Sequence, residues 1–194
     1  MKLSPQVRLY REGTPPPSNT QQDWIVLPHL PSTSFGDGTH PTTRLCAGAV
    51  DFLCRQQAFT AVLDVGTGTG VLARIARARG VKMVVGTEID PAAILAATNN
   101  AALDSHPVEL EILNALPDHW GPIFDLVVAN ILENPLLELA PNLVNALAPG
   151  GRLLISGFTP LQAHSLRSTY ISHGLTFISE SHLGEWAMLT FCLI

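Results

Sequence analysis

The chain has 194 residues, of which 46% are hydrophobic and only 14% charged, and its formal net charge is −5. This length and apolar content suffice for one domain with a substantial core, while the acidic balance argues against a dedicated nucleic-acid-binding protein, which would carry a basic face. No apolar run approaches the length of a membrane span, and no apolar segment typical of a signal peptide follows Lys2. We therefore expect a cytoplasmic protein that binds neither nucleic acid nor a membrane.

The cysteines and histidines give no sign of a metal site. Cys46, Cys54 and Cys192 lack metal-ligand spacing, and no two of the seven histidines form an H-x-x-x-H pair. We therefore expect free thiols in a reducing compartment and no bound metal.

Residues 1–32 are rich in proline and polar residues and include the run Pro15–Pro17. Such a composition is typical of a linker. Trp24–Leu27 has two alternatives, one short strand or an apolar clip onto the domain that follows. We interpret residues 1–32 as an N-terminal extension or linker, and residues 33–194 as the functional domain.

A loop and a helix start follow at residues 34–44, Ser-Phe-Gly-Asp-Gly-Thr-His-Pro-Thr-Thr-Arg. Its two glycines predict a loop whose backbone a ligand can approach closely. A helix then begins at Pro41 or Thr42 and runs to about Gln57. From these residues alone, the segment has the capacity to bind a ligand.

Residues 61–73 predict a buried strand, a glycine-rich turn and a helix. The strand, Ala61–Val65, is apolar except for Asp64, and Gly66, Gly68 and Gly70 follow at every second position. The glycines allow a sharp turn against a ligand, and the helix N-terminus favours a carboxylate or phosphate. A dinucleotide fingerprint needs its third glycine three positions after the second, so this spacing disfavours a nicotinamide cofactor.

The next strand, within residues 82–91, ends in acidic residues. Glu88 lies about 20 residues after the glycine turn, where an acid accepts hydrogen bonds from ribose hydroxyls. Asp90 is the competing candidate, but it precedes Pro91 and is better suited to cap the next helix. We therefore favour Glu88, with a solvated charge at a strand end as the alternative reading.

The rest of the chain alternates helices and strands and predicts a doubly wound α/β fold. We expect a Rossmann-like, seven-stranded, mostly parallel sheet with a C-terminal antiparallel hairpin and helices on both faces. Trp186, at the start of the last strand, is assigned to the core. The expected elements are a helix over 92–103, strands over 108–113 and 124–132, a helix from Asn134-Pro135 to about 146, a strand over 152–158, a helix over 160–172, and strands over 175–181 and 186–194.

Three segments together resemble one enzyme family. They are the loop Phe-Gly-x-Gly-Thr-His-Pro-Thr-Thr, the turn Val-Leu-Asp-Val-Gly-x-Gly-x-Gly-Val-Leu, and Asn-Ile-Leu at 130–132. This combination resembles the class I methyltransferases that modify protein eleven of the large ribosomal subunit. The resemblance covers about residues 33–194 and implies a methyltransferase domain that uses S-adenosylmethionine. The family's N-terminal substrate-recognition domain has no counterpart in residues 1–32.

The resemblance also implies a set of cofactor-site residues. Thr43 would contact the cofactor, and Phe35 and His40 would border the cofactor or the target amine, with a purely local role at the helix start as the alternative for His40. Asp37 stands where the family usually carries threonine. The implied cofactor site comprises Phe35, His40, Thr43, Asp64, Gly66, Gly68, Gly70, Glu88, Asn130 and, at the position that holds the adenine ring, Ala115.

Asn130 is the catalytic candidate, because it ends a buried strand and ligands of open parallel sheets bind beyond the strands' carboxyl ends. The resemblance implies that it accepts a hydrogen bond from the target nitrogen and directs the lone pair at the methyl carbon. The alternative is a turn residue that caps its own backbone. Ile131 and Leu132 follow where base-modifying relatives carry Pro-Pro and an aromatic residue, which disfavours a nucleobase substrate.

We therefore interpret the chain as an S-adenosylmethionine-dependent N-methyltransferase that acts on a protein amine, a lysine or an N-terminal amino group. A ribosomal protein is one candidate partner, and a monomer is favoured. Two alternatives stay open at this point: a methyltransferase for a small-molecule amine, and a non-catalytic protein that binds S-adenosylmethionine.

Overall fold

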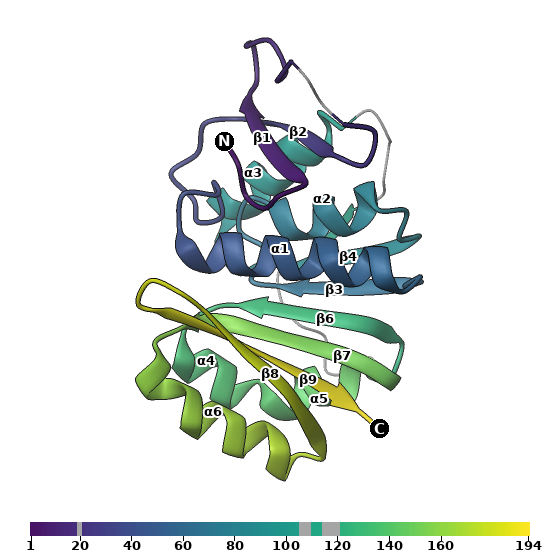
Figure 1. The fold of residues 1–194 in the computed structure, drawn as a ribbon, viewed down its shortest axis with the longest axis vertical. Coiled ribbons are helices and arrows are strands. Elements are labelled where there is room, and N and C mark those ends of the chain that lie inside the picture. The colour runs from purple at the N-terminus through teal and green to yellow at the C-terminus, as the bar shows by residue number, and fades with distance from the viewer. Residues whose placement is uncertain (19–20, 105–109, 114–120) are drawn as a thin grey trace.

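The structure is a computed structural model that describes residues 1–18, 21–104, 110–113 and 121–194. Figure 1 shows the elements in chain order. They are β1 (Val7–Arg11), β2 (Ile25–His29), α1 (Pro41–Gln56), β3 (Ala61–Val65), α2 (Val71–Ala78), β4 (Met83–Thr87), α3 (Pro91–Ala101), β5 (Leu110–Leu113), β6 (Phe124–Asn130), α4 (Glu133–Glu138), α5 (Ala140–Ala146), β7 (Leu147–Phe158), α6 (Pro160–Ser172), β8 (Leu175–Leu183) and β9 (Trp186–Leu193).

The described strands form a seven-stranded sheet in the order β5-β4-β3-β6-β7-β9-β8, together with a two-stranded sheet of β1 and β2. Strands β3 to β7 pair in parallel, and β9 pairs antiparallel with both β7 and β8. The chain runs outward from β3 to β5 and then returns to the other side of β3 with β6. This reversal confirms the expected fold class and creates a switch point between β3 and β6.

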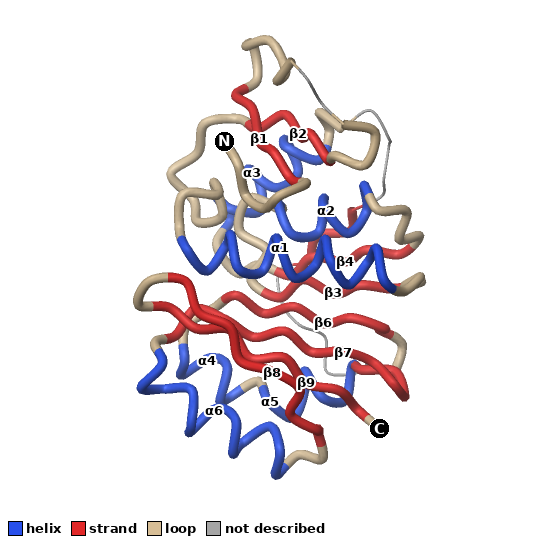
Figure 2. Tube along the Cα trace, in the orientation of Figure 1, coloured by secondary structure: helices blue, strands red, loops and turns tan. Residues whose placement is uncertain are grey.

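Helices cover both faces of the large sheet, with α1 and α2 on one face and α4 to α6 on the other (Figure 2). Strand β3 shows how the sequence arranges this: Leu63 and Val65 belong to the core under α4 to α6, whereas Val62 belongs to the core under α1 and α2. The alternation follows from the two-residue period of a strand. No described helix is long and apolar enough to cross a membrane.

The N-terminal segment contains more structure than a linker. Of the two alternatives for Trp24–Leu27, the structure has the strand, which is β2. Its partner β1 is a strand that we did not expect. Val7, Leu9, Ile25 and Leu27 are buried in the same core as α1 and α2. These apolar residues alternate along each strand. Their burial favours two paired strands, although the residues around them have a composition typical of a linker.

Two local differences from the expected elements have clear causes. The helix expected from Asn134 to 146 is two helices that meet at Leu139, because Pro141 has no N–H to continue the hydrogen-bond ladder. The first of these begins at Glu133, with Leu132 rather than Asn134 at its N-cap. Strand β7 also begins earlier than expected, at Leu147, and its register with β6 is irregular there.

Candidate active site

A cavity of about 610 Å³ lies at the carboxyl ends of the parallel strands, at the switch point of the sheet. This volume is typical of a small-molecule site. The cavity is lined by Phe35, His40, Thr42, Val65, Gly66, Gly68, Thr87, Glu88, Ile89, Asn130, Ile131, Leu132, Pro135, Leu139, Gly157 and Trp186. It therefore brings together six of the predicted site residues: Phe35, His40, Gly66, Gly68, Glu88 and Asn130.

The N–H groups of the glycine turn are paired within the chain itself. The N–H groups of Gly66 and Thr67 donate to the Thr87 carbonyl at 2.8 and 2.9 Å, and that of Thr69 donates to the Phe35 carbonyl at 3.0 Å. The Gly68 N–H donates to Glu88 Oε2 at 2.9 Å. The turn is thus tied both to β4 and to the loop before α1.

The carboxylate of Asp64 fills the N-terminal end of α2. Its Oδ2 accepts hydrogen bonds from Thr67 Oγ1 at 2.6 Å and from the Ala73 N–H at 3.1 Å. Burial raises the pKa of Asp64 to about 6. The position at which we expected a ligand's carboxylate or phosphate is therefore taken by Asp64, which stabilises the turn from behind and does not line the cavity.

The glycines serve the close packing of the turn against its neighbours. Gly66 and Gly68 have φ values of +68° and +56°, which other residues rarely adopt. A Cβ on Gly66 would collide with Ile131 Cγ2, and one on Gly68 would collide with the Phe35 carbonyl oxygen. Both positions therefore require glycine whether or not a ligand is bound.

Asn100 on α3 connects the glycine turn to the N-terminal segment. Its side-chain Nδ2 donates to the Thr69 carbonyl at 3.1 Å, and its Oδ1 accepts from the Leu30 N–H at 2.9 Å. Thr69 Oγ1 in turn donates to the Gly36 carbonyl at 2.7 Å. Because Asn100 is fully buried, this bridge fixes the turn, the loop before α1 and the end of β2 relative to one another.

The two acids after β4 have separate positions. Glu88 lines the cavity, and its Oε1 accepts from the N–H groups of Ile89 at 2.8 Å and Asp90 at 3.1 Å. Asp90 caps α3 by accepting from the Ala92 N–H at 2.9 Å, with Pro91 in the first turn, as predicted. Glu88 is thus the acid available to a ligand.

Asn130 presents a buried acceptor at the cavity. It ends β6 opposite Ser156 of β7 and is only 8% exposed. Its side-chain Oδ1 has no hydrogen-bond partner among the described residues. Buried acceptors are nearly always paired, so this oxygen indicates a donor that a ligand supplies.

Three aromatic rings line one side of the cavity. The His40 ring lies 5.1 Å from Phe35 and 4.5 Å from Trp186, edge to face in the second pair. His40 also caps α1, where its Nδ1 accepts from the Thr42 N–H at 3.3 Å, so it has both a local role and a place at the cavity. Burial lowers its pKa and favours the neutral imidazole.

Trp186 is the lining residue that the sequence reading assigned to the core. It is half-buried and faces the cavity because the tight turn at Gly184 brings the start of β9 back to the mouth of the sheet. A tryptophan directly after a hairpin turn is a signal that could have indicated this position, since loops at the sheet's end carry site residues.

The remaining predicted residues lie away from the cavity surface or outside the described residues. Thr42 lines the cavity, whereas Thr43 is buried beside it with an Oγ1 that has no partner in the described part of the chain. Asp64 and Gly70 lie behind the turn, and Ala115 falls outside the described residues. Among the described residues, no group of three or more His, Cys, Asp or Glu could hold a metal ion.

Comparison with known proteins identifies the family. The family described as ribosomal protein L11 methyltransferase (PrmA) matches residues 9–192. The L11 methyltransferase of Geobacter metallireducens is 40% identical over 86% of this chain and 54% of its own length. That of Cellvibrio japonicus is 41% identical over 88% of this chain and 57% of its own length. The chain thus spans about half the length of the curated relatives that it matches.

Solved structures agree with the sequence match. The ribosomal protein L11 methylase of Lactobacillus delbrueckii superposes with a TM-score of 0.85 at 29% identity, covering 98% of this chain and 95% of that one. The N-methyltransferase NodS of Bradyrhizobium japonicum, solved with S-adenosyl-L-homocysteine, has a TM-score of 0.63 at 17% identity over 80% of this chain and 89% of that one, a likeness of fold. The chain belongs to the ribosomal protein L11 methyltransferase family.

Proposed function

We propose that this chain is an S-adenosylmethionine-dependent methyltransferase that acts on an amine nitrogen of a protein. The observation that carries the proposal is the buried Oδ1 of Asn130 at the cavity, which has no hydrogen-bond partner in the described part of the chain. It lies at a switch-point cavity that also contains Glu88 and the glycine turn. Membership of the methyltransferase family supports the same reading.

The residues at the cavity fit the cofactor. Glu88 offers carboxylate oxygens to ribose hydroxyls, and Gly66 and Gly68 present backbone without a Cβ toward the methionyl part. The Thr43 hydroxyl is buried beside the cavity without a partner among the described residues, and it is the group that we propose for a contact with the cofactor. Asp64 and Gly70 would contribute by holding the turn.

In this proposal, catalysis depends on aligning the amine nitrogen with the methyl group of the cofactor. S-adenosylmethionine supplies a methyl group on a sulfonium, so the leaving group needs no acid from the protein. Asn130 Oδ1 accepts a hydrogen bond from the amine and orients the nitrogen lone pair for in-line displacement. The neutral His40 imidazole and the apolar surroundings favour the uncharged amine, because burial disfavours an ammonium ion.

The rim of the cavity supports an acceptor group carried by a protein. Leu132 and Ile89 line the cavity and are 69% and 84% exposed, and Phe35 is 49% exposed. Exposed apolar side chains around a functional cavity are typical of a surface that another protein covers. We propose a ribosomal protein as the acceptor, with the chain acting as a cytoplasmic monomer in which residues 33–194 form the catalytic domain and residues 1–32 an extension packed on it.

The first test is calorimetric titration with S-adenosyl-L-homocysteine, with a nicotinamide dinucleotide as control. We expect one-to-one micromolar binding of the former and none of the latter. Transfer of a labelled methyl group to purified ribosomal protein L11 then tests the acceptor. A folded protein that binds neither compound contradicts the cofactor assignment, and binding without transfer to any protein amine contradicts the catalytic one.

A further inference from the structure

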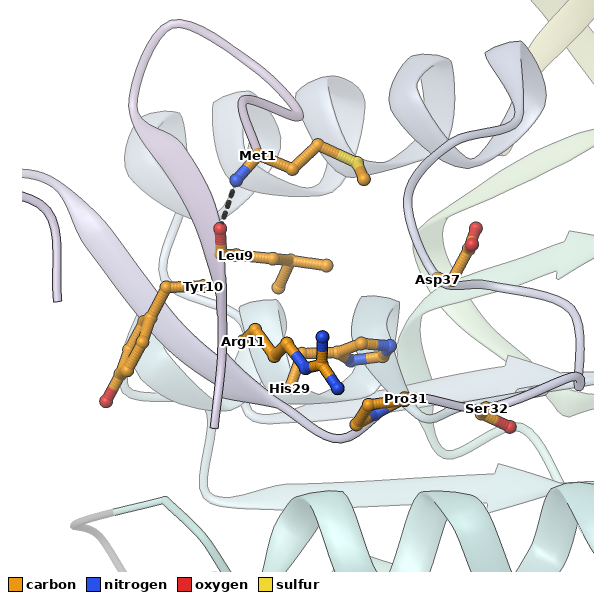
Figure 3. Close-up of a pocket in the computed structure, with 8 residues that line it drawn as sticks. All are labelled: Met1, Leu9, Tyr10, Arg11, His29, Pro31, Ser32 and Asp37. Atoms are coloured by element: carbon orange, nitrogen blue, oxygen red, sulfur yellow. Dashed lines mark hydrogen bonds between the residues drawn. The ribbon is translucent and has the colours of Figure 1, made fainter. Parts of the chain in front are cut away.

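A second cavity, of about 440 Å³, lies beside the loop that precedes α1 and is separate from the candidate active site. Figure 3 shows it between the ends of β1 and β2 and Asp37 of that loop. No role proposed above uses it. It is lined by Met1, Leu9, Tyr10, Arg11, His29, Pro31, Ser32 and Asp37.

His29 is a buried polar side chain at this cavity. It is 8% exposed, and neither ring nitrogen has a hydrogen-bond partner among the described residues. Burial, and next the positive charge of Arg74, lower the pKa of His29, so the ring is neutral and has one N–H to donate. A ring whose donor and acceptor are both unused indicates a partner that the chain does not supply.

Arg11 lies next to His29, and its guanidinium donors are available to a ligand. The two residues are register partners in the β1–β2 pair, and Figure 3 shows the Arg11 side chain beside the His29 ring. The side chain of Arg11 is exposed, and its guanidinium makes no hydrogen bond or ion pair with any residue that the structure describes. A guanidinium beside an imidazole N–H forms a set of donors that suits an oxyanion.

The other residues that line this cavity limit how much negative charge a ligand can carry. Leu9 and Pro31 are apolar. Asp37 lies across from Arg11, and its Oδ1 accepts from the N–H and hydroxyl of Thr39 at 2.9 and 2.7 Å. The charged groups that line the cavity are the Arg11 guanidinium, the Met1 ammonium, which donates to the Leu9 carbonyl oxygen, and the Asp37 carboxylate. Their sum is one positive charge, which a monoanion neutralises and a doubly charged phosphate exceeds.

We propose that this cavity binds a small monocarboxylic acid. Its carboxylate accepts hydrogen bonds from the Arg11 guanidinium and the His29 N–H, and its apolar body lies on Leu9 and Pro31. The site is independent of the proposed methyl transfer, because the two cavities share no lining residue.

Two-dimensional ¹H–¹⁵N NMR of the whole chain tests the proposal. The probes are sodium hexanoate and sodium benzoate, with hexanamide as a neutral control and inorganic phosphate as the competing anion. We expect saturable shifts of the backbone N–H signals of residues 9–12, 29, 30, 32 and 36–39 with the two carboxylates. We expect none with hexanamide and weaker ones with phosphate.

Arg11→Gln supplies the decisive variant, because an exposed side chain can change without unfolding the protein. We expect it to weaken carboxylate binding about tenfold or more, as the loss of a charge-assisted pair does. Lys82→Gln, which removes an exposed positive charge outside this cavity, should leave binding unchanged. Any of four results would overturn the proposal. They are carboxylate shifts that do not saturate, equal shifts with hexanamide, tighter binding of phosphate than of the carboxylates, and an Arg11→Gln variant that binds like wild type.

Discussion

The two walls of the main cavity differ in how their polar groups are paired. The glycine wall consists of Gly66, Gly68 and Glu88, and its hydrogen bonds are made within the chain. The Asn130 wall consists of Asn130, Ile131, Leu132 and Trp186, where a buried acceptor is unpaired among the described residues and Leu132 is exposed. The first wall is complete before a ligand arrives, and the second lacks a donor.

This difference indicates a division of labour. A ligand at the glycine wall has to exchange with hydrogen bonds that already stabilise the turn, so substitutions there should change cofactor affinity and stability together. A ligand at the Asn130 wall supplies the missing donor, so substitutions there should lower turnover and leave the fold intact.

The largest effect is expected for Asn130→Ala. We expect turnover to fall about a hundredfold to a thousandfold, the range typical when one preorganised hydrogen bond to the reacting group is removed. S-adenosyl-L-homocysteine affinity should change little. Steady-state methyl-transfer rates and calorimetry measure the two quantities.

Asn134→Ala is the matched control, because Asn134 is an exposed asparagine four residues away that does not line the cavity. It should retain wild-type turnover. Equal losses in both variants, or a large loss of cofactor affinity in Asn130→Ala, would remove the distinction between the walls.

The next effect is a pH dependence that originates behind the glycine wall. Asp64 titrates at about pH 6 in the folded chain but near pH 4 when unfolded, so between these values the folded state holds a proton that the unfolded state has lost. The free energy of unfolding should therefore fall by about 3 kcal/mol as the pH rises through this window.

Asp64→Asn isolates this contribution, since the amide oxygen keeps an acceptor for Thr67 and Ala73 but does not titrate. Urea unfolding of both proteins from pH 4 to pH 7 gives the difference at each pH. We expect wild type to lose stability relative to the variant as the pH rises, and a constant difference would show that Asp64 keeps its ordinary pKa.

A smaller effect is expected for Glu88→Ala. The substitution removes the carboxylate proposed for the ribose and the partner of the Gly68 N–H, so cofactor affinity should fall by about 1–3 kcal/mol. Thermal stability should fall as well. Glu138→Ala, an exposed glutamate that does not line the cavity, serves as the control in the same calorimetric titration. A Glu88→Ala variant that binds the cofactor as tightly as wild type would contradict the assignment of Glu88 to the ribose.

The smallest effect is expected for Trp186→Leu on the Asn130 wall. Losing one aromatic edge contact should raise the acceptor's KM about threefold to tenfold, while cofactor affinity stays as it is. Trp24→Leu, which removes a tryptophan at the N-terminal segment, should leave KM unchanged. A variant that changes cofactor affinity and leaves the acceptor's KM unchanged would show that Trp186 contacts the cofactor, which contradicts this prediction.

The sequence predicted the glycine wall well because its signals are local. The strand over Ala61–Val65 was predicted with its observed bounds, and Asp90 and Pro91 start the next helix as expected. In each case the residues that determine the structure are neighbours in the chain. The position of Glu88 at the cavity followed from the same reasoning, one strand further on.

The features that were missed depend on contacts between distant segments. No local pattern shows that Asp64 would occupy the N-terminal end of α2, or that β1 would be buried against α1. The aromatic group likewise joins Trp186 to His40, which lie far apart in the chain. Tertiary packing decides these positions, so composition and periodicity alone could not.

The aromatic group has a consequence for the order in which the cavity is completed during synthesis. Synthesis on the ribosome proceeds from the N-terminus, so Phe35 and His40 emerge long before Trp186 completes their side of the cavity. The glycine turn and the Asn130 strand also precede β9. The Asn130 wall, where we propose that the acceptor binds, is therefore complete only after the final hairpin has been translated and has joined the sheet.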